Sequence, residues 1–456
     1  EYITRCQSFL QLGKPDNDFL VYLPVYDMWN DIPGRFVGFD IHKMDQYAPK
    51  FIKTIQTIMA GGYDVDYISD SFIKSTSCQD GMLKTRGGAC YKALIVPAVK
   101  LIPVSTLKKL VALARQGATV VFVEHYPEDV PGYASLKQNR EQLFALLEQL
   151  PGEKSFRGTQ AFNFGKGRII VGSDYHETLE RTGVPAEELK TRWGVQFIRR
   201  THTEGHHYFI SNLQANDVEG WVTLNVPEKH IMCFDPMTGK RGIAKTREVE
   251  GKTQVYMQLK SGESVILQTF TRSLQGEPEW KYRKEMDYSL SLDHGWKLRF
   301  VESYPAIEGE FKIDTPSSWT EVAHPAAKIN RGTALYSLEL DLPELSADDW
   351  ILDLGDVRES ARVRINGQEA GIAWAAPFRL SIGQLLKSGK NLIEVEVTNL
   401  PANSIAEMDR QGKQWRIFED INMAKLNYEK GTYGHWETLP SGLNGIVRLI
   451  PVKYLF

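Results

Sequence analysis

The sequence predicts a multi-domain fold that combines an α/β domain with all-β domains, and three observations support this. The chain has 456 residues, which is enough for about three domains. Continuous apolar runs alternate with amphipathic helical stripes in its first part, as in a parallel sheet covered by helices. Short segments with period-2 alternation fill the rest, as in antiparallel sandwiches. We therefore expect domains at residues 14–200, 201–285 and 286–456, after a terminal helix at 1–13.

Residues 14–200 are expected to form a parallel α/β domain. The apolar run after Asp18 is typical of a strand that is buried on both faces. Ser105 is expected to cap the start of a helix, and Gly117 to end it. Alternation of strands and helices favours a parallel sheet wrapped by helices. The expected strands are 18–24, 65–69, 93–97 and 118–124, and the expected helices are 47–60 and 105–115.

Residues 201–285 are expected to form a small antiparallel β-sandwich. Short apolar strands recur at regular spacing, and turns such as 235–239 separate them. On a strand, His202, Glu204 and His206 would share one face and could hold a metal ion, although Gly205 weakens the strand. A polar edge is the default interpretation, and no metal site is assigned. The expected strands are 208–211, 220–226, 230–234, 254–259 and 264–270.

Residues 286–456 are expected to form a jelly-roll β-sandwich. Val363 and Ile365 alternate with polar residues, which puts apolar side chains on one face of a strand. The pair Asn366 and Gly367 is typical of a type I′ hairpin turn. A second alternating segment, 392–399, follows a turn at 388–391.

Several motifs resemble carbohydrate-active enzymes. The segment Trp374, Pro377 and Phe378 after the hairpin resembles the sugar-binding, galactose-binding-like domain of family-2-like glycoside hydrolases. Residues 400–422 and the closing segment 439–443 resemble the C-terminal part of family-106 glycoside hydrolases, the α-L-rhamnosidases of pectin degradation. Residues 14–200 resemble the degenerate glutamine-amidotransferase-like domain of several β-galactosidase and rhamnosidase families. Cys90 has no nucleophile-elbow motif around it, so amidotransferase chemistry is not expected.

The resemblance implies that the catalytic machinery lies outside this chain. The pattern of residues 1–13 predicts a helix without an N-cap residue that ends at Gly13. In the family, this helix would be the terminal helix of a missing (β/α)8 catalytic barrel. The catalytic carboxylates would then precede residue 1, and no catalytic residue is assigned here. Calcium is implied for the parent enzyme, and no cofactor or metal is expected within this chain.

Three functions stay open on this interpretation. The first is an accessory part of an α-L-rhamnosidase-like glycoside hydrolase that acts on plant-type polysaccharide, with carbohydrate and the missing barrel as partners. The second is a stand-alone carbohydrate-binding or scaffolding protein. The third is a part of a β-galactosidase-like glycosidase with another sugar specificity, which the sandwich motif alone does not exclude.

Candidate sugar-binding residues fall in two parts of the chain. The loop after the first strand carries Asp27 and Trp29, and ligands of open parallel sheets gather at the carboxyl ends of strands. The alternative is an ordinary turn. In the last domain the hairpin motif offers Asn366, Trp374 and Arg379, although Trp374 is expected to be packed rather than exposed. A polar and aromatic insertion after Asn399 faces either another domain or a ligand, and it offers Asn403, Asp409, Arg410, Trp415, Arg416 and Asn422.

Charge and cysteine content narrow the class of protein. The net charge is −3, which gives no electrostatic basis for nucleic-acid binding. No apolar run is long enough to cross a bilayer. A disulfide between Cys78 and Cys90 is geometrically possible, and it would suit an oxidising compartment. With the family resemblance, this favours a periplasmic or secreted bacterial protein, and the chain contains no signal peptide.

Overall fold

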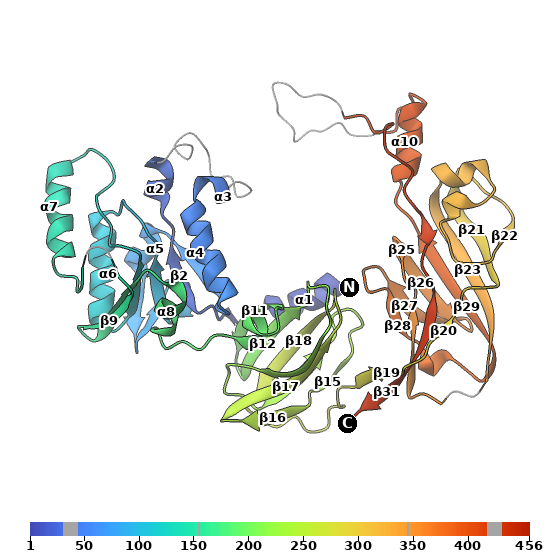
Figure 1. The fold of residues 1–456 in the computed structure, drawn as a ribbon, viewed down its shortest axis with the longest axis horizontal. Coiled ribbons are helices and arrows are strands. Elements are labelled where there is room, and N and C mark those ends of the chain that lie inside the picture. Colours follow the sequence, from blue (N-terminus) through green and yellow to red (C-terminus); the bar gives the residue numbers. More distant parts are fainter. Residues whose placement is uncertain (31–43, 154–155, 344–345, 417–430) are drawn as a thin grey trace. The chain divides into compact units, whose positions relative to one another are not determined.

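The structure is a computed structural model that describes residues 1–30, 44–153, 156–343, 346–416 and 431–456. The chain divides into two compact units, Glu1–Trp280 and Lys281–Phe456. Within the described residues, strands outnumber helices, and the helices that cover a sheet are confined to the first unit (Figure 1). The predicted combination of α/β and all-β folds is therefore confirmed at this level. None of the helices within the described residues is long and apolar enough to span a bilayer.

A six-stranded sheet forms the first half of the first unit. Alternate residues of its strands enter two different cores: Leu20 and Tyr22 lie in one, and Phe19 and Val21 in the other. Both faces are covered, by α4 (Pro49–Ala60) and α8 (Tyr175–Glu180) on one side and by α5 (Asp70–Ser75), α6 (Val104–Gln116) and α7 (Leu136–Leu147) on the other. This explains the continuous apolar runs. The strand order is β3 (Val65–Ile68), β2 (Phe19–Tyr22), β7 (Ala93–Val96), β8 (Thr119–Val123), β10 (Gly167–Gly172) and β9 (Thr159–Phe164), parallel except for β9.

Two local predictions in this half are wrong. Pro103, not Ser105, is the N-cap of α6, because the fixed φ of proline suits a helix start and the helix already begins at Val104. The segment after β2 is not a loop but a short helix, α2 (Val25–Asn30), and residues 31–34 lie outside the described residues. Gly117 does end α6, at φ +131°.

The four cysteines are free thiols. Cys78 lies on β4 (Ser77–Gln79) and Cys90 on β6 (Cys90–Tyr91), and these two strands flank β5 (Met82–Lys84) in a small sheet. The intervening strand separates the two thiols, so the structure contains no disulfide between them.

A β-sandwich forms the second half of the first unit. All five strands expected for this region are present, and their inward side chains form one core. β11 crosses the expected domain boundary at residue 200, and β1 pairs with it in antiparallel fashion. One sheet has the order β1 (Lys14–Pro15), β11 (Gln196–His202), β12 (Gly205–Ser211), β18 (Ser264–Phe270), β14 (His230–Phe234) and β15 (Arg241–Ile243); the other has the order β13 (Val218–Thr223), β17 (Lys252–Leu259) and β16 (Thr246–Val249).

The N-terminal helix α1 (Tyr2–Leu10) packs on this sandwich. The ring of Phe9 lies 4.7 Å from that of Phe234, and the Tyr2 hydroxyl is 2.7 Å from that of Ser264. The helix ends with Gln11 as its C-cap, so the prediction that Gly13 caps it is wrong. Gly13 instead passes so close to the Thr201 carbonyl that a Cβ there would lie 1.7 Å from its oxygen.

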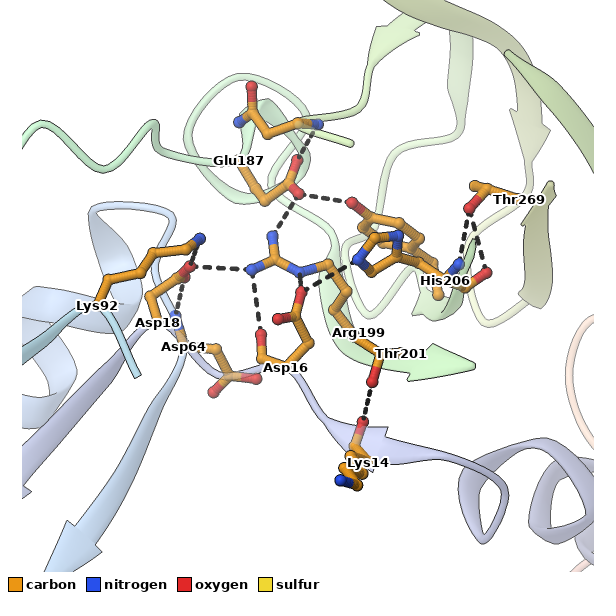
Figure 2. Close-up of polar contacts among 12 residues, drawn as sticks. Lys14, Asp16, Asp18, Asp64, Lys92, Glu187, Arg199, Thr201, His206 and Thr269 are labelled. Atoms are coloured by element: carbon orange, nitrogen blue, oxygen red, sulfur yellow. Dashed lines mark hydrogen bonds and ion pairs between the residues drawn. The ribbon is translucent and has the colours of Figure 1, made fainter. Parts of the chain in front are cut away.

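A buried ion cluster joins the two halves of the first unit (Figure 2). The Arg199 guanidinium donates to Asp16 Oδ2 at 2.5 Å, Asp18 Oδ1 at 2.9 Å and Glu187 Oε1 at 2.7 Å. Only 3% of the Arg199 side chain is exposed. Burial alone would lower the pKa of Arg199, but Tyr208 and the three carboxylates outweigh it and raise the pKa. We call Asp16, Asp18, Glu187 and Arg199 the Arg199 cluster.

The second unit is a sandwich of two antiparallel sheets around one apolar core. Asn366 and Gly367 have φ of +52° and +79°, so the type I′ turn between β26 (Ser360–Ile365) and β27 (Gln368–Ala373) is confirmed. Val363 and Ile365 are fully buried. One sheet has the order β22 (Glu310–Ile313), β21 (Trp296–Tyr304), β23 (Arg331–Leu342), β29 (Gly389–Thr398), β26 and β27; the other has β19 (Tyr282–Glu285), β31 (Arg448–Leu455), β24 (Asp349–Asp353) and β28 (Arg379–Ser381), with β20 (Leu290–Ser291) also on β31.

Candidate functional site

The strongest candidate site is a cluster of aromatic and charged side chains around the end of α10 (Ala402–Arg410), which stands at one end of the second sandwich (Figure 1). We call it the α10 aromatic cluster. It comes from the last turn of α10, from the segment directly after the helix and from the segment that returns to β30 (Gly442–Leu443), which pairs with β25 (Val357–Arg358). Its members are Asp409, Trp415, Arg416, Tyr433 and Trp436.

Local bonds hold α10 against the return segment. Pro401 is the N-cap residue, and Gly412, at φ +62°, follows the C-cap. The Asn403 amide is buried, donates to the Leu439 carbonyl at 2.8 Å and accepts from the Leu439 N–H at 2.8 Å. Arg410 Nε donates to the Gly434 carbonyl at 3.0 Å. Asn403 and Arg410 therefore brace the insertion.

Asp409 organises the cluster. Its carboxylate accepts from Trp415 Nε1 at 2.6 Å and from the Tyr433 N–H at 2.5 Å. The bond from Trp415 is the main cause that lowers the pKa of Asp409, so the carboxylate stays ionised. The ring centroids of Trp415 and Tyr433 are 5.8 Å apart, and those of Tyr433 and Trp436 are 4.6 Å apart.

Arg416 covers the aromatic rings. Its guanidinium carbon lies 5.1 Å from the Trp415 ring centre and 5.2 Å from that of Tyr433, and it donates to the Gly431 carbonyl. Trp436 is 40% exposed. Ring faces next to a guanidinium and a carboxylate are the groups that bind the C–H faces and hydroxyls of sugars. Asn422 lies outside the described residues.

A polar pocket lies beside the same return segment. Its volume is about 700 Å³, and its lining includes Ser318, Thr320, Thr438 and Asn444. The side-chain oxygen of Asn444 is buried and has no hydrogen-bond partner in the part of the chain that the structure describes. Hydroxyls and an unfilled amide acceptor are suited to hydroxyl-rich ligands.

The hairpin candidates are already bonded within the sandwich. Asn366 donates to the Leu385 carbonyl at 2.9 Å and accepts from the Leu392 N–H at 3.0 Å. Arg379 is ion-paired with Asp353 at 2.8 Å and Glu285 at 2.9 Å. Trp374 is 46% exposed, so the prediction that it is packed is wrong. Its exposure follows from its position at the end of the edge strand β27.

The two candidates of the first unit lie on α2. Asp27 accepts from the backbone N–H groups of Lys100 and Leu101 at 2.7 and 2.8 Å, so its carboxylate anchors the loop after β7. Trp29 is 58% exposed, with its ring near Tyr26. The exposed ring is available to a ligand, whereas the carboxylate is already used.

Tyr433 and Trp436 were missed by the sequence interpretation. The run Tyr433, Gly434, His435 and Trp436 is aromatic and lacks strand alternation, which is a signal that could have found them. Among the described residues, no group of three or more His, Cys, Asp or Glu side chains could hold a metal ion. In the hairpin between β11 and β12, His206 Nδ1 lies 2.9 Å from Glu228 Oε2, and His202 Nε2 lies 3.1 Å from the Thr269 carbonyl.

Comparisons with known proteins agree with the resemblance. The family model of α-L-rhamnosidase, glycoside hydrolase family 106, matches residues 32–246. A rhamnosidase from Novosphingobium sp. PP1Y has the same fold, with a TM-score of 0.72 and 24% identity over 98% of this chain and 40% of that one. A Formosa agariphila protein named "Putative beta-glucuronidase" is 29% identical over 197 residues, which are 39% of this chain and 17% of that protein.

These matches show that the chain is similar to family-106 glycoside hydrolases. The chain spans less than half of the length of either relative. The matched residues 32–246 lie in the first unit, whereas the motifs that suggested the family lie in the second. The relatives are named as glycoside hydrolases of two specificities, a rhamnosidase and a glucuronidase.

Proposed function

We propose that this chain, which is similar to family-106 glycoside hydrolases, is an accessory part of such an enzyme and binds plant-type polysaccharide at the α10 aromatic cluster. The observation that carries the proposal is the arrangement of Trp415, Tyr433 and Trp436 beside Arg416 and Asp409. The rings offer stacking surfaces for pyranose C–H faces, and the charged groups offer partners for hydroxyls.

The proposal includes the parts of the enzyme that the family resemblance implies. The catalytic carboxylates and a calcium ion would belong to a barrel that precedes Glu1. The first sheet would be a degenerate glutamine-amidotransferase-like domain, in which exposed Cys90 has no catalytic role. The second unit would be a jelly roll of the galactose-binding type, and the protein would be periplasmic or secreted. In this setting the α10 aromatic cluster would line the substrate groove.

Binding measurements test the cluster. Trp415→Ala and Arg416→Ala should each weaken binding of rhamnose-containing pectic oligosaccharides by about tenfold, or ~1.4 kcal/mol, in calorimetric titration. The control variants Tyr288→Ala and Arg362→Ala remove exposed side chains of the same unit and should leave the affinity unchanged. Unchanged affinity with a sharply lower melting temperature in both test variants would show that the insertion is a structural brace.

Activity measurements test the accessory role. The chain alone should not hydrolyse an aryl α-L-rhamnoside, because the two carboxylates that such hydrolysis needs would lie outside it. The proposal would be contradicted if the chain alone hydrolysed the substrate and replacement of one of its Asp or Glu residues abolished this activity. A stand-alone carbohydrate-binding protein is the second candidate, and the α10 aromatic cluster favours it equally. To separate the two candidates, the chain is fused to a barrel or co-expressed with one. If Trp415→Ala then leaves kcat/KM unchanged, the stand-alone carbohydrate-binding protein is favoured.

A further inference from the structure

A second surface in the first unit has the features of a binding platform. The three-stranded sheet β13, β17 and β16 has one face in the sandwich core, where Val222, Val255 and Met257 are buried. Since side chains alternate along a strand, the residues between them lie on the opposite, outward face. This outward face, which we call the β17 face, carries Glu219 and Trp221 from β13, Lys252, Gln254, Tyr256 and Gln258 from β17, and Arg247 and Val249 from β16.

Two aromatic rings occupy the middle of the β17 face. Trp221 and Tyr256 are directly paired across β13 and β17. Their ring centroids are 5.3 Å apart and their planes meet at 70°. Both side chains stay partly exposed. An outward strand face does not need such rings for its own packing, so they form an apolar strip on an otherwise polar surface.

Arg247 is held in a fixed position on this strip. Its guanidinium carbon lies 4.3 Å from the centre of the Trp221 ring, and its Nε donates to Gln254 Oε1 at 2.7 Å. Gln254 in turn donates to Thr223 Oγ1 at 3.1 Å. This bond uses Nε, and the guanidinium has two terminal nitrogens as further donors. A planar guanidinium held in this way is suited to a carboxylate.

Hydrogen bonds also fix the other side of the ring pair. Tyr256 donates its hydroxyl proton to Glu219 Oε1 at 2.6 Å, and Gln258 Nε2 donates to the same oxygen at 3.0 Å. Burial, followed by Glu219, raises the pKa of Tyr256 to about 12, so its hydroxyl remains protonated. These bonds hold the side chains in place before a ligand arrives, which lowers the entropic cost of binding.

Charge decides which ligand suits the β17 face. The chain as a whole has a net charge of −3, yet this face carries the cations Arg247 and Lys252 against the single carboxylate of Glu219. An acidic ligand is therefore favoured over a neutral one. A pyranose carboxylate fits both features, because its C–H face can lie on the rings while its carboxylate reaches the guanidinium.

We propose that the β17 face binds polysaccharide segments that contain uronic acids, with Arg247 as the carboxylate ligand and Trp221 and Tyr256 as the sugar platform. The choice of a sugar as occupant rests on the proposed glycoside-hydrolase function. The site itself is independent of the α10 aromatic cluster, because it lies in the other unit and shares no residue with it.

The test uses the full chain and calorimetric titration with oligogalacturonate. Arg247→Gln should weaken binding by about tenfold. Fully methyl-esterified oligogalacturonate should bind the unmodified chain with a similar loss, since it lacks the carboxylate. Arg272→Gln is the matched control: Arg272 is also exposed, and it lies 5.1 Å from the Phe270 ring centre, but its Nε is ion-paired with Glu204 at 2.7 Å. This variant should bind as the unmodified chain does.

Three outcomes would overturn the proposal. These are no binding of oligogalacturonate by the unmodified chain, equal binding by Arg247→Gln and the unmodified chain, and equal affinity for polyglutamate, which would indicate a general polyanion surface. Trp415→Ala separates this inference from the proposed function: it should preserve oligogalacturonate binding. If Trp415→Ala abolishes that binding and Arg247→Gln does not, the acidic sugar binds in the second unit and the β17 face is not its site.

Discussion

The Arg199 cluster and the α10 aromatic cluster use the same groups with opposite consequences. In the first, a guanidinium that is 3% exposed meets three carboxylates within 2.9 Å. In the second, a partly exposed guanidinium lies over two rings near one carboxylate. A buried charge must be neutralised by its surroundings, whereas an exposed one can keep bonding capacity for a ligand. Burial therefore indicates which charged clusters hold the fold and which are open to binding.

The largest loss of stability is expected for Arg199→Met, which tests the role of burial directly. The variant leaves Asp16, Asp18 and Glu187 close together without their central cation. Removing one partner of a buried ion pair typically lowers the free energy of unfolding by about 3–5 kcal/mol. Urea unfolding monitored by circular dichroism should show a loss of this size. The control Arg364→Met removes a partly exposed cation that pairs with Glu396 on the second sandwich and should leave the midpoint nearly unchanged. Equal effects of both substitutions would contradict the role of burial.

A substitution in the hairpin turn tests the stability of the second unit through backbone conformation alone, because it leaves all charges in place. Gly367 lies at φ +79° in the turn after β26, and a β-branched side chain resists this conformation. Gly367→Val should therefore lower the free energy of unfolding of the second unit by about 1–3 kcal/mol. Gln368→Val, one residue later at the start of β27, is the control. An unchanged midpoint in Gly367→Val would mean that the turn tolerates the side chain.

Asp64 makes the first unit sensitive to pH. It lies beside the Arg199 cluster, where its N–H donates to Asp18, and burial raises its pKa to about 6. The protonated form is thus favoured in the folded state, so its stabilising effect is complete below about pH 4 and is lost as the pH rises through about 6. Asp64→Asn should be more stable than the unmodified chain at pH 7.5, on the order of 1 kcal/mol, and equally stable near pH 4.

Thermal unfolding at both pH values checks the Asp64 prediction. Asp45→Asn, an exposed aspartate of α3 (Met44–Tyr47), is the control and should show no such difference between the two pH values. A constant difference between Asp64→Asn and the unmodified chain across this pH range would argue against titration of Asp64.

The smallest expected effect on stability is that of Asp409→Asn. The carboxylate lies at the surface, so the unfolding midpoint of the second unit should stay close to that of the unmodified chain. The geometry of the cluster should change, because Asp409 accepts the indole N–H of Trp415. In an NMR spectrum assigned with Trp415→Phe, the Trp415 indole resonance should shift in Asp409→Asn. No shift would mean that this bond does not form in solution.

Strands and turns that are determined by neighbouring residues could be predicted from the sequence. The strands β2, β3, β7 and β8 followed from apolar runs of the correct length, and the hairpin turn followed from Asn366 and Gly367. The start of α6 was predicted with Ser105 as the cap, but Pro103 is the N-cap residue and the helix already begins at Val104. In each of these cases a few neighbouring residues decide the outcome.

Sites that depend on distant residues could not be predicted in this way. Arg199 bonds to Asp16 across 183 positions, and Asp27 bonds to backbone groups 73 and 74 positions away. Asp409, Trp415 and Arg416 were identified by composition, since charged and aromatic residues without alternation are poor core formers. Their partner Tyr433 was not, because it lies 24 positions from Asp409 in the sequence.

The pairing of β1 with β11 makes the first sandwich a discontinuous domain. Lys14 faces Thr201 and Pro15 faces Arg200, so the whole α/β segment leaves and re-enters the sandwich through two adjacent strands. Inserted domains are tolerated where their ends lie close together. The α/β segment is thus an insertion between two neighbouring strands of the sandwich, and a shortened chain that joins β1 to β11 by a turn must keep all of β11 and the core residues Leu189 and Val195.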